Sequence, residues 1–256
     1  MAPTAARLIK IWLMVAKMAA RTYFLNSLAT ILFLVGKVVR FLLFFVFLFA
    51  VLSSGQTLAG YDRERVIFFF LIFNLVDIMV QFFFRGVYQF RPLVVSGNFD
   101  LDLLKPLPSF FRPIFGWTDI FDFLTLIPLW LYFFWFVFNN QLFPDAVAFV
   151  LFFLLLLNSL VLAFAFNLLV CAVCILTTEI DHLVWVYRDL TSMARFPTDI
   201  YQRGIQAVLT FTVPVIILMT VPAKALLGVL SWQWIAGSFL ITGLFLWGSV
   251  KLWCYA

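Results

Sequence analysis

The chain has 256 residues, of which 65% are hydrophobic and only 11% are charged, with 35 Phe and a net charge of +5. Soluble domains average about 45–50% apolar and about 25% charged residues. The composition therefore excludes an ordinary soluble enzyme or binding domain and predicts an all-α polytopic membrane protein. With ~20 apolar residues in each span, we expect about six transmembrane helices and no separate soluble domain.

The N-terminal segment, residues 4–35, is predicted to lie in the membrane interface. On a helix, its four cations Arg7, Lys10, Lys17 and Arg21 share one side, opposite a face of apolar residues. Such a basic amphipathic helix favours the cytoplasmic surface of a membrane. Residues 23–35 are expected to continue this element as a connector to the first span.

Six apolar runs follow this segment. The expected spans are residues 36–54, 66–88, 118–138, 146–172, 177–196 and 232–253. The loop before the second span has balanced charge and is expected outside, whereas residues 89–116 lie among cations and are expected on the cytoplasmic side. An even number of spans places both termini in the cytoplasm.

Two of the later segments are irregular. Residues 177–196 hold several charges, so this stretch is either a short span buried among other helices or not a span at all. Residues 197–228 contain Pro197, Pro214 and Pro222 in an apolar background. Prolines at this spacing predict short broken helices that dip into the membrane without crossing it.

One short polar segment, Gly97–Pro106, lies between two long apolar runs. It is charged, helix-prone and bounded by Gly97 and Pro106 on the basic side of the membrane. These features predict a docking element that contacts a cytosolic partner.

Asn74, Asp77 and Gln81 follow the spacing i, i+3, i+7 and share one face of the second span. A carboxylate near mid-membrane is costly and usually faces a pathway or a partner. The three side chains therefore indicate either a translocation pathway or subunit interface, or structural hydrogen bonds to neighbouring helices. Both interpretations stay open at this level.

Other reactive residue types do not form a recognisable site. Glu179, Asp181 and His182 are too few for zinc and are better explained as the start of a helix. Cys171 and Cys174 fall in an apolar helix and are expected to be packing residues. No phosphate-binding loop of the GxxxxGK type is present. We expect no catalytic residue, bound cofactor or metal in this chain.

Two groups of motifs resemble the ABC-2 type permeases, in particular a bacterial branch once grouped as a domain of unknown function. The first is Gly97–Pro106, similar to G-x-[LF]-D-x-x-L-[LV]-[KR]-P between spans two and three. The second is a series in which Thr177-Thr178-Glu179 is followed by Arg195–Tyr201, Leu209–Pro214 and Val221–Gly228. It is similar to the series T-x-E, [YF]-P-x-x-I-Y, T-F-x-x-P and x-P-A-x-x-L-L-G. Arg188-Asp189 departs from the family, which often has a Gly pair there.

The resemblance implies an N-terminal elbow helix, six spans, a cytoplasmic coupling helix and an external re-entrant hairpin. The implied ATPase-coupling residues are Gly97, Phe99, Asp100, Leu101, Asp102, Leu103, Leu104, Lys105 and Pro106. The hairpin would be marked by Pro197, Tyr201, Pro214 and Pro222. The translocation pathway or subunit interface would involve Asn74, Asp77, Gln81 and Glu179. Leu101, Leu103 and Leu104 are expected to fill a groove on the ATPase, with Asp100, Asp102 and Lys105 as polar rim contacts.

The resemblance further implies the membrane subunit of an ATP-driven exporter in the bacterial cytoplasmic membrane. ATP and Mg would be bound by a separate cytosolic ATPase dimer, and a second permease subunit, more often a different one, would complete the complex beside membrane lipids. Two other functions are weighed against it. One is an ion- or proton-coupled carrier that uses Asp77 and Glu179, and the other is a membrane scaffold that transports nothing.

Overall fold

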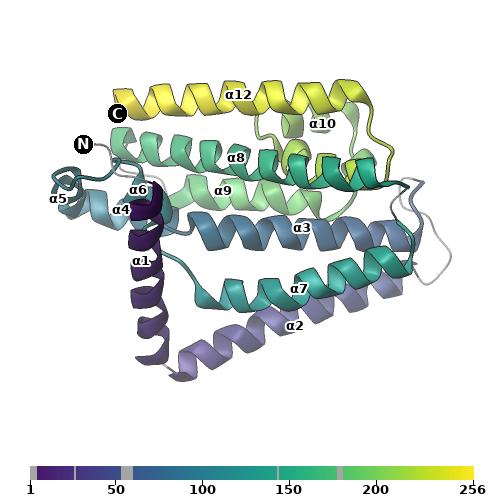
Figure 1. The fold of residues 1–256 in the computed structure, drawn as a ribbon, viewed down its shortest axis with the longest axis horizontal. Coiled ribbons are helices and arrows are strands. Elements are labelled where there is room, and N and C mark those ends of the chain that lie inside the picture. Colours follow the sequence, from purple (N-terminus) through teal and green to yellow (C-terminus); the bar gives the residue numbers. More distant parts are fainter. Residues whose placement is uncertain (1–4, 26, 53–59, 143, 178–180) are drawn as a thin grey trace.

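The computed structural model describes residues 5–25, 27–52, 60–142, 144–177 and 181–256, and its regular structure there is helical (Figure 1). The α-helices are α1 (Ala5–Leu25), α2 (Ser27–Leu52), α3 (Arg63–Phe84), α4 (Val87–Val95), α5 (Asn98–Leu103), α6 (Phe111–Phe115), α7 (Ile120–Asn139), α8 (Ala146–Thr177), α9 (Asp181–Ser192), α10 (Arg203–Phe211), α11 (Val221–Leu226) and α12 (Trp232–Tyr255). The short helices are η1 (Met193–Arg195), η2 (Thr198–Ile200) and the π-helix η3 (Ile216–Thr220).

The long helices α3, α7, α8 and α12 run lengthwise in one bundle, and α1 lies crosswise to them (Figure 1). The short helices α4, α5 and α6 gather at one end, which we call the α5 end, together with the C-terminus. The turn that joins α7 to α8 lies at the other end, which we call the opposite end. The all-α polytopic class expected from composition is confirmed.

Four helical segments within the described ranges are long and apolar enough to cross a membrane. They are Arg63–Val95, Ile120–Asn139, Ala146–Thr177 and Trp232–Tyr255. A fifth candidate is the pair Arg203–Phe211 and Ile216–Leu226, which is bent by 85°. The expected spans 66–88, 118–138, 146–172 and 232–253 fall on the first four segments.

The other two expected spans differ from the helices that carry them. Residues 36–52 of the first expected span belong to α2, and residues 53 and 54 lie outside the described residues. Because α2 begins already at Ser27, the chain passes from α1 to α2 well before the boundary expected at residue 36. Residues 177–196 carry α9, whose 12 residues rise only about 18 Å. A perpendicular span needs about 30 Å.

The segment from α9 to η2 nevertheless runs the length of α3. Near its start, the Trp185 ring lies 5.9 Å from that of Tyr88 in α4. Near its end, the Tyr61 hydroxyl, just before α3, donates a 2.8 Å hydrogen bond to Asp199. The 3₁₀ turn of η1 and the extended backbone at Phe196 lengthen the path beyond α9.

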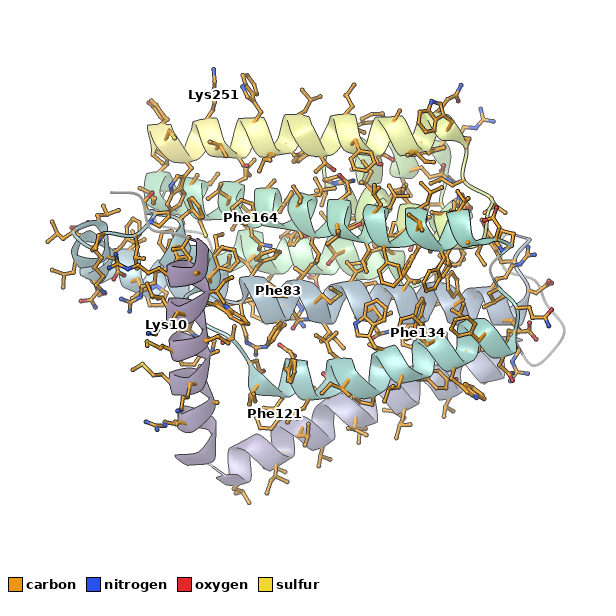
Figure 2. All side chains as sticks on the ribbon, in the orientation of Figure 1. Lys10, Phe83, Phe121, Phe134, Phe164 and Lys251 are labelled. Carbon is orange, nitrogen blue, oxygen red and sulfur yellow. The ribbon has the colours of Figure 1, made fainter. Side chains whose placement is uncertain are left out.

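Aromatic side chains fill the spaces between the long helices (Figure 2). Phe133 of α7 is fully buried between Phe68 of α3, at 6.1 Å, and Phe152 of α8, at 5.5 Å. Trp12 attaches α1 to α3 through the rings of Phe82 and Phe83. With every backbone group bonded inside its own helix, packing of this kind holds such a bundle together.

Candidate functional site

The predicted docking element occupies the outer edge of the α5 end (Figure 1). Gly97 has φ 70°, a left-handed conformation that glycine adopts without steric cost, and it turns the chain from α4 into α5. A polar segment between two apolar runs therefore becomes a tight helical corner.

Phe99 points inward and anchors this corner. Its ring is 5.0 Å from Phe90 of α4, edge to face, and 6.3 Å from Trp253 of α12. The Trp253 indole also donates a 2.9 Å hydrogen bond to the hydroxyl of Ser109. The element is thus attached to two long segments of the bundle, α3–α4 and α12, where they reach the α5 end.

Asp102 also lies inside the element. Its Oδ1 accepts hydrogen bonds from Lys105 at 2.7 Å and from Arg112 at 2.6 Å, and the residue is only 8% exposed. This position corrects the expectation that Asp102 forms part of a polar rim. Charge-assisted bonds of this type instead hold the loop 104–110 against α5.

Three leucines face outward from the same corner. Leu101 is 60% exposed, Leu103 52% and Leu104 83%, and Asp100 and Lys105 are exposed beside them. An apolar cluster with charged neighbours is typical of a protein contact surface. Asp100 and Lys105 are therefore exposed beside the leucines, and their role as rim contacts stays a prediction.

A second attachment joins α6, whose Arg112 is bonded to Asp102 of the element, to the end of α3. The amide of Gly86, at the junction of α3 and α4, donates a 3.2 Å hydrogen bond to the carbonyl of Ile114 in α6. A Cβ at this position would lie 2.6 Å from the carbonyl oxygen of Pro113. The two backbones therefore touch at Gly86, and a displacement of α6 must displace this junction.

The polar face of α3 is arranged as a chain of hydrogen bonds. Gln81 donates a 2.7 Å bond to Asp77 and accepts a 3.2 Å bond from Arg188 of α9. Asn74 instead donates to the carbonyl of Phe70 in its own helix. Asp77, Gln81 and Asn74 border one groove, whereas Glu179 lies outside the described residues.

A buried ion cluster near the α5 end was not expected from the sequence. Asp119 and Asp122, at the start of α7, have side chains that are 0% and 3% exposed. Arg85 lies 3.0 and 2.8 Å from them, and Lys37 of α2 lies 2.5 Å from Asp122 and 3.5 Å from Asp119. The only sequence signal is two acids in the first turn of an apolar run, which resembles ordinary helix capping.

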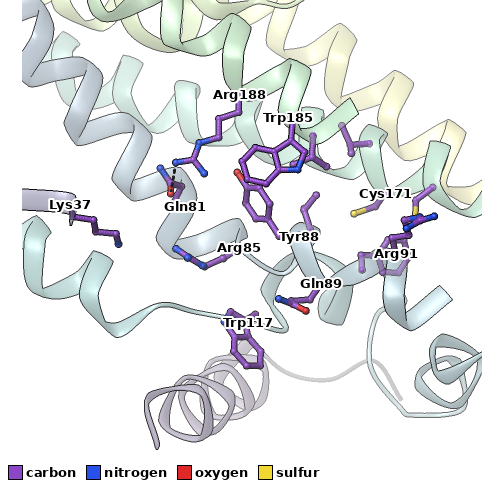
Figure 3. A pocket seen from close by; sticks show the side chains of 15 residues that line it. Lys37, Gln81, Arg85, Tyr88, Gln89, Arg91, Trp117, Cys171, Trp185 and Arg188 are labelled. Atoms are coloured by element: carbon purple, nitrogen blue, oxygen red, sulfur yellow. Dashed lines mark hydrogen bonds between the residues drawn. The ribbon is translucent and has the colours of Figure 1, made fainter. Parts of the chain in front are cut away.

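A cavity of about 460 Å³ opens beside this cluster, between α3–α4, α8 and α9 (Figure 3). A groove of about 840 Å³ adjoins it between α2, α3 and α7. Volumes in this range are usual for small-molecule sites.

Comparison with family models supplies the decisive match. The model described as ABC-2 family transporter protein covers residues 38–256, which is most of the chain. The chain belongs to the ABC-2 transporter family. It is a permease, the transmembrane component of an ABC transporter. Comparisons with curated proteins and with solved structures return no match.

The permease also contains the Pro-rich segment 197–228, and both ends of this segment lie at the opposite end of the bundle. Asp199 is bound by Tyr61, and Gly228, with φ +67°, packs against Pro144. Between them, the carbonyl of Ile217 accepts a 3.2 Å hydrogen bond from Ser159, near the middle of α8. Pro214 and Pro222 flank η3, and Pro197 precedes η2. The segment enters the bundle and returns to the end from which it came.

Asp199 holds this hairpin to the start of α3. One carboxylate oxygen accepts from Tyr61, and the other lies 2.8 Å from the Lys224 ammonium of α11. Burial, followed by the hydrogen bond to Asp199, raises the pKa of Tyr61 above its ordinary value, so the hydroxyl keeps its proton at neutral pH.

We expect Asp199→Asn to loosen α11 without unfolding the permease. The site is partly exposed, so the expected loss is only about 0.5–1 kcal/mol. Hydrogen exchange of the α11 amides should become faster. Asp62→Asn is the control, because Asp62 is an exposed acid near Tyr61 whose side chain makes no cap hydrogen bond. Unchanged exchange in Asp199→Asn would contradict a clamping role.

Proposed function

We propose that this permease is the membrane subunit of an ATP-driven exporter, with ATP and Mg bound by a separate cytosolic ABC ATPase dimer. A second permease subunit, favoured to be a different chain, completes the translocation unit. The complex resides in the bacterial cytoplasmic membrane with both termini of this chain in the cytoplasm.

The observation that carries this proposal is an exposed apolar surface on an anchored helix. Leu101, Leu103 and Leu104 are presented outward, while Phe99 and Asp102 fasten the same six-residue helix to the bundle. A loosely attached loop would move alone when a partner displaces it, whereas a helix fixed to the bundle passes the displacement to the helices it contacts.

The charges support the orientation. The α5 end carries Arg85, Arg91, Lys105, Arg112 and Lys251, and Lys251 points away from the bundle in Figure 2. At the opposite end, the three cations Arg63, Arg65 and Lys224 lie among the acids Asp62, Glu64, Asp145 and Asp199. Positive charge collects on the cytoplasmic side of membrane proteins, which is the side where a cytosolic ATPase docks.

Motion would pass from the ATPase to the polar groove by two contacts. A tilt of α5 presses through Phe99 on α4 and α12, and the Gly86–Ile114 contact carries the motion of α6 to α3. Because α3 bears Asp77 and Gln81, its displacement changes the shape of the groove. Closure of an ATPase dimer thereby alternates access by a rigid-body shift of packed helices.

Leu104→Asp tests the docking surface. A charge placed in an apolar contact remains unpaired, so the affinity of the permease for its ATPase should fall at least about tenfold. ATPase activity stimulated by the permease should fall with it, and Asp100→Lys should act in the same direction. Co-purification and ATP hydrolysis are measured on the reconstituted complex.

Val229→Asp is the matched control, since Val229 is an apolar side chain, 54% exposed, in the loop at the opposite end. It should leave ATPase binding unchanged. Full stimulation by both Leu104→Asp and Asp100→Lys would reject the docking role. Transport that needs a proton gradient and no ATPase would instead favour a carrier.

A further inference from the structure

The charged side chains that line the cavity beside the ion cluster are all of one sign. Among the residues that the structure describes, its lining contains the four cations Lys37, Arg85, Arg91 and Arg188 and no carboxylate (Figure 3). The carboxylates that hold Lys37 and Arg85 approach from α7, outside this lining. Because Asp119 and Asp122 balance the charges of Lys37 and Arg85, the cations that would give the cavity a positive potential and favour an anion are Arg91 and Arg188.

Arg188 is placed to face such an anion. It donates to the amide oxygen of Gln81, which is a neutral acceptor, and its guanidinium lies 5.9 Å from the centre of the Trp185 ring. Figure 3 shows Arg188 beside Gln81 and Trp185, with Arg85 one turn beyond Gln81 at the end of α3. A guanidinium has five donors, so the bonds to Gln81 and to the hydroxyl of Tyr88 leave donors for a phosphate or carboxylate.

The cavity continues into an apolar groove. Lys37, Gln81 and Arg188 border both spaces. Beyond them, the wall contributed by α2 is apolar and includes Leu42, Leu43 and Phe47. The facing wall bears Asp77 and Asp122 together with Arg195, so the groove has mixed charge, whereas the charged residues that line the cavity are all cations.

We infer that the cavity and the groove together bind an amphipathic anion, with a phosphate-like headgroup in the cavity and an apolar tail along α2. This inference rests on the proposed function, because it names the class of cargo that the exporter would carry. A polar recess joined to an apolar groove matches the two halves of a lipid-like molecule, and it excludes a cationic amphiphile by charge.

Dodecyl phosphate is a suitable probe for the full-length permease in phosphatidylcholine nanodiscs. Binding is measured by quenching of tryptophan fluorescence, because Trp117 and Trp185 line the cavity. Empty nanodiscs correct for partition of the probe into lipid. Saturable binding is expected for dodecyl phosphate but not for inorganic phosphate or dodecyltrimethylammonium at the same concentrations.

Arg188→Gln should weaken binding of dodecyl phosphate about tenfold or more, because it removes a charge-assisted hydrogen bond. Arg91→Gln is a second variant on a different helix, and elution as a single monodisperse species shows that each variant is folded. Lys251→Gln is the control: it removes a cation at the same end, stacked on Trp247 and outside the cavity, and should leave binding unchanged.

Equal binding of dodecyltrimethylammonium, or unchanged affinity in both arginine variants, would overturn the inference. Binding of inorganic phosphate as tight as that of dodecyl phosphate would also overturn it, since the tail would then contribute nothing. The same preparations are assayed for ATPase association. If the permease binds its ATPase but not the probe, only the cargo class is rejected. If it binds the probe but no ATPase, the proposed function is rejected.

Discussion

Asp122→Ala should destabilise the permease by about 3–5 kcal/mol, the usual cost of removing one partner from a buried ion cluster. Asp122 is almost completely buried between Lys37 and Arg85, so the variant leaves two cations facing a single carboxylate, Asp119. Since these residues join α2, α3 and α7, the contact of α2 with the bundle should weaken first. The free energy of unfolding can be measured by titration with sodium dodecyl sulfate in mixed micelles.

The double variant Lys37→Met/Asp122→Leu distinguishes charge balance from packing. It removes one cation and one carboxylate and keeps the Arg85–Asp119 pair at 3.0 Å. We expect it to recover at least about half of the loss, as neutral replacements of buried ion pairs often do. Asp189→Asn, an exposed acid on α9, should change stability by less than about 0.5 kcal/mol. A double variant as unstable as Asp122→Ala would show that charge balance is not the cause.

Gly86→Ala should separate α6, to which the docking element is bonded through Arg112, from α3. The added Cβ would lie 2.6 Å from the carbonyl oxygen of Pro113 and 2.8 Å from that of Ile114, and backbone oxygens cannot move aside as a flexible side chain can. The φ of Gly86 is −53°, which any residue adopts, so the effect is purely steric. Overpacking of this kind costs about 1–3 kcal/mol. Both stability and permease-stimulated ATP hydrolysis should fall.

Gly204→Ala is the matched control for this prediction. Gly204 lies in α10, and a Cβ there would meet nothing within 4 Å. Alanine should therefore be neutral or stabilise the helix by up to about 1 kcal/mol. If both variants keep full ATPase stimulation, the Gly86–Ile114 contact is not part of the coupling route.

Several features of this permease could be predicted from the sequence because they depend on local composition. Long apolar runs must be helices in a membrane, since each backbone group has to be satisfied within its own segment. The glycine at position 97 and the proline at position 106 mark the docking element, and three prolines mark the hairpin 197–228. The Asn74, Asp77 and Gln81 face followed from helical spacing alone.

The helix boundaries near residues 27 and 181 depended on more than composition. An apolar run from 23 to 52 does not reveal where the chain turns, because one helix and two helices have the same hydropathy. The polar helix α9 packs in the bundle because it finds partners on neighbouring helices. Its Arg188 bonds to Gln81 of α3, and its Tyr187 stacks on Phe166 of α8. Such partners are remote in sequence.

The sequence by itself determined that this chain is an all-helical membrane protein, and it marked the polar segment Gly97–Pro106 for which we propose a docking role. Only the tertiary structure decided that Asp102 and Phe99 are anchors while Leu104 is presented outward, because all of them lie within one short segment. It also decided that Lys37, Arg85, Asp119 and Asp122 meet, although up to 85 residues separate them. Local composition sets which helices form, whereas the burial of charge and the shape of a cavity depend on which helices become neighbours.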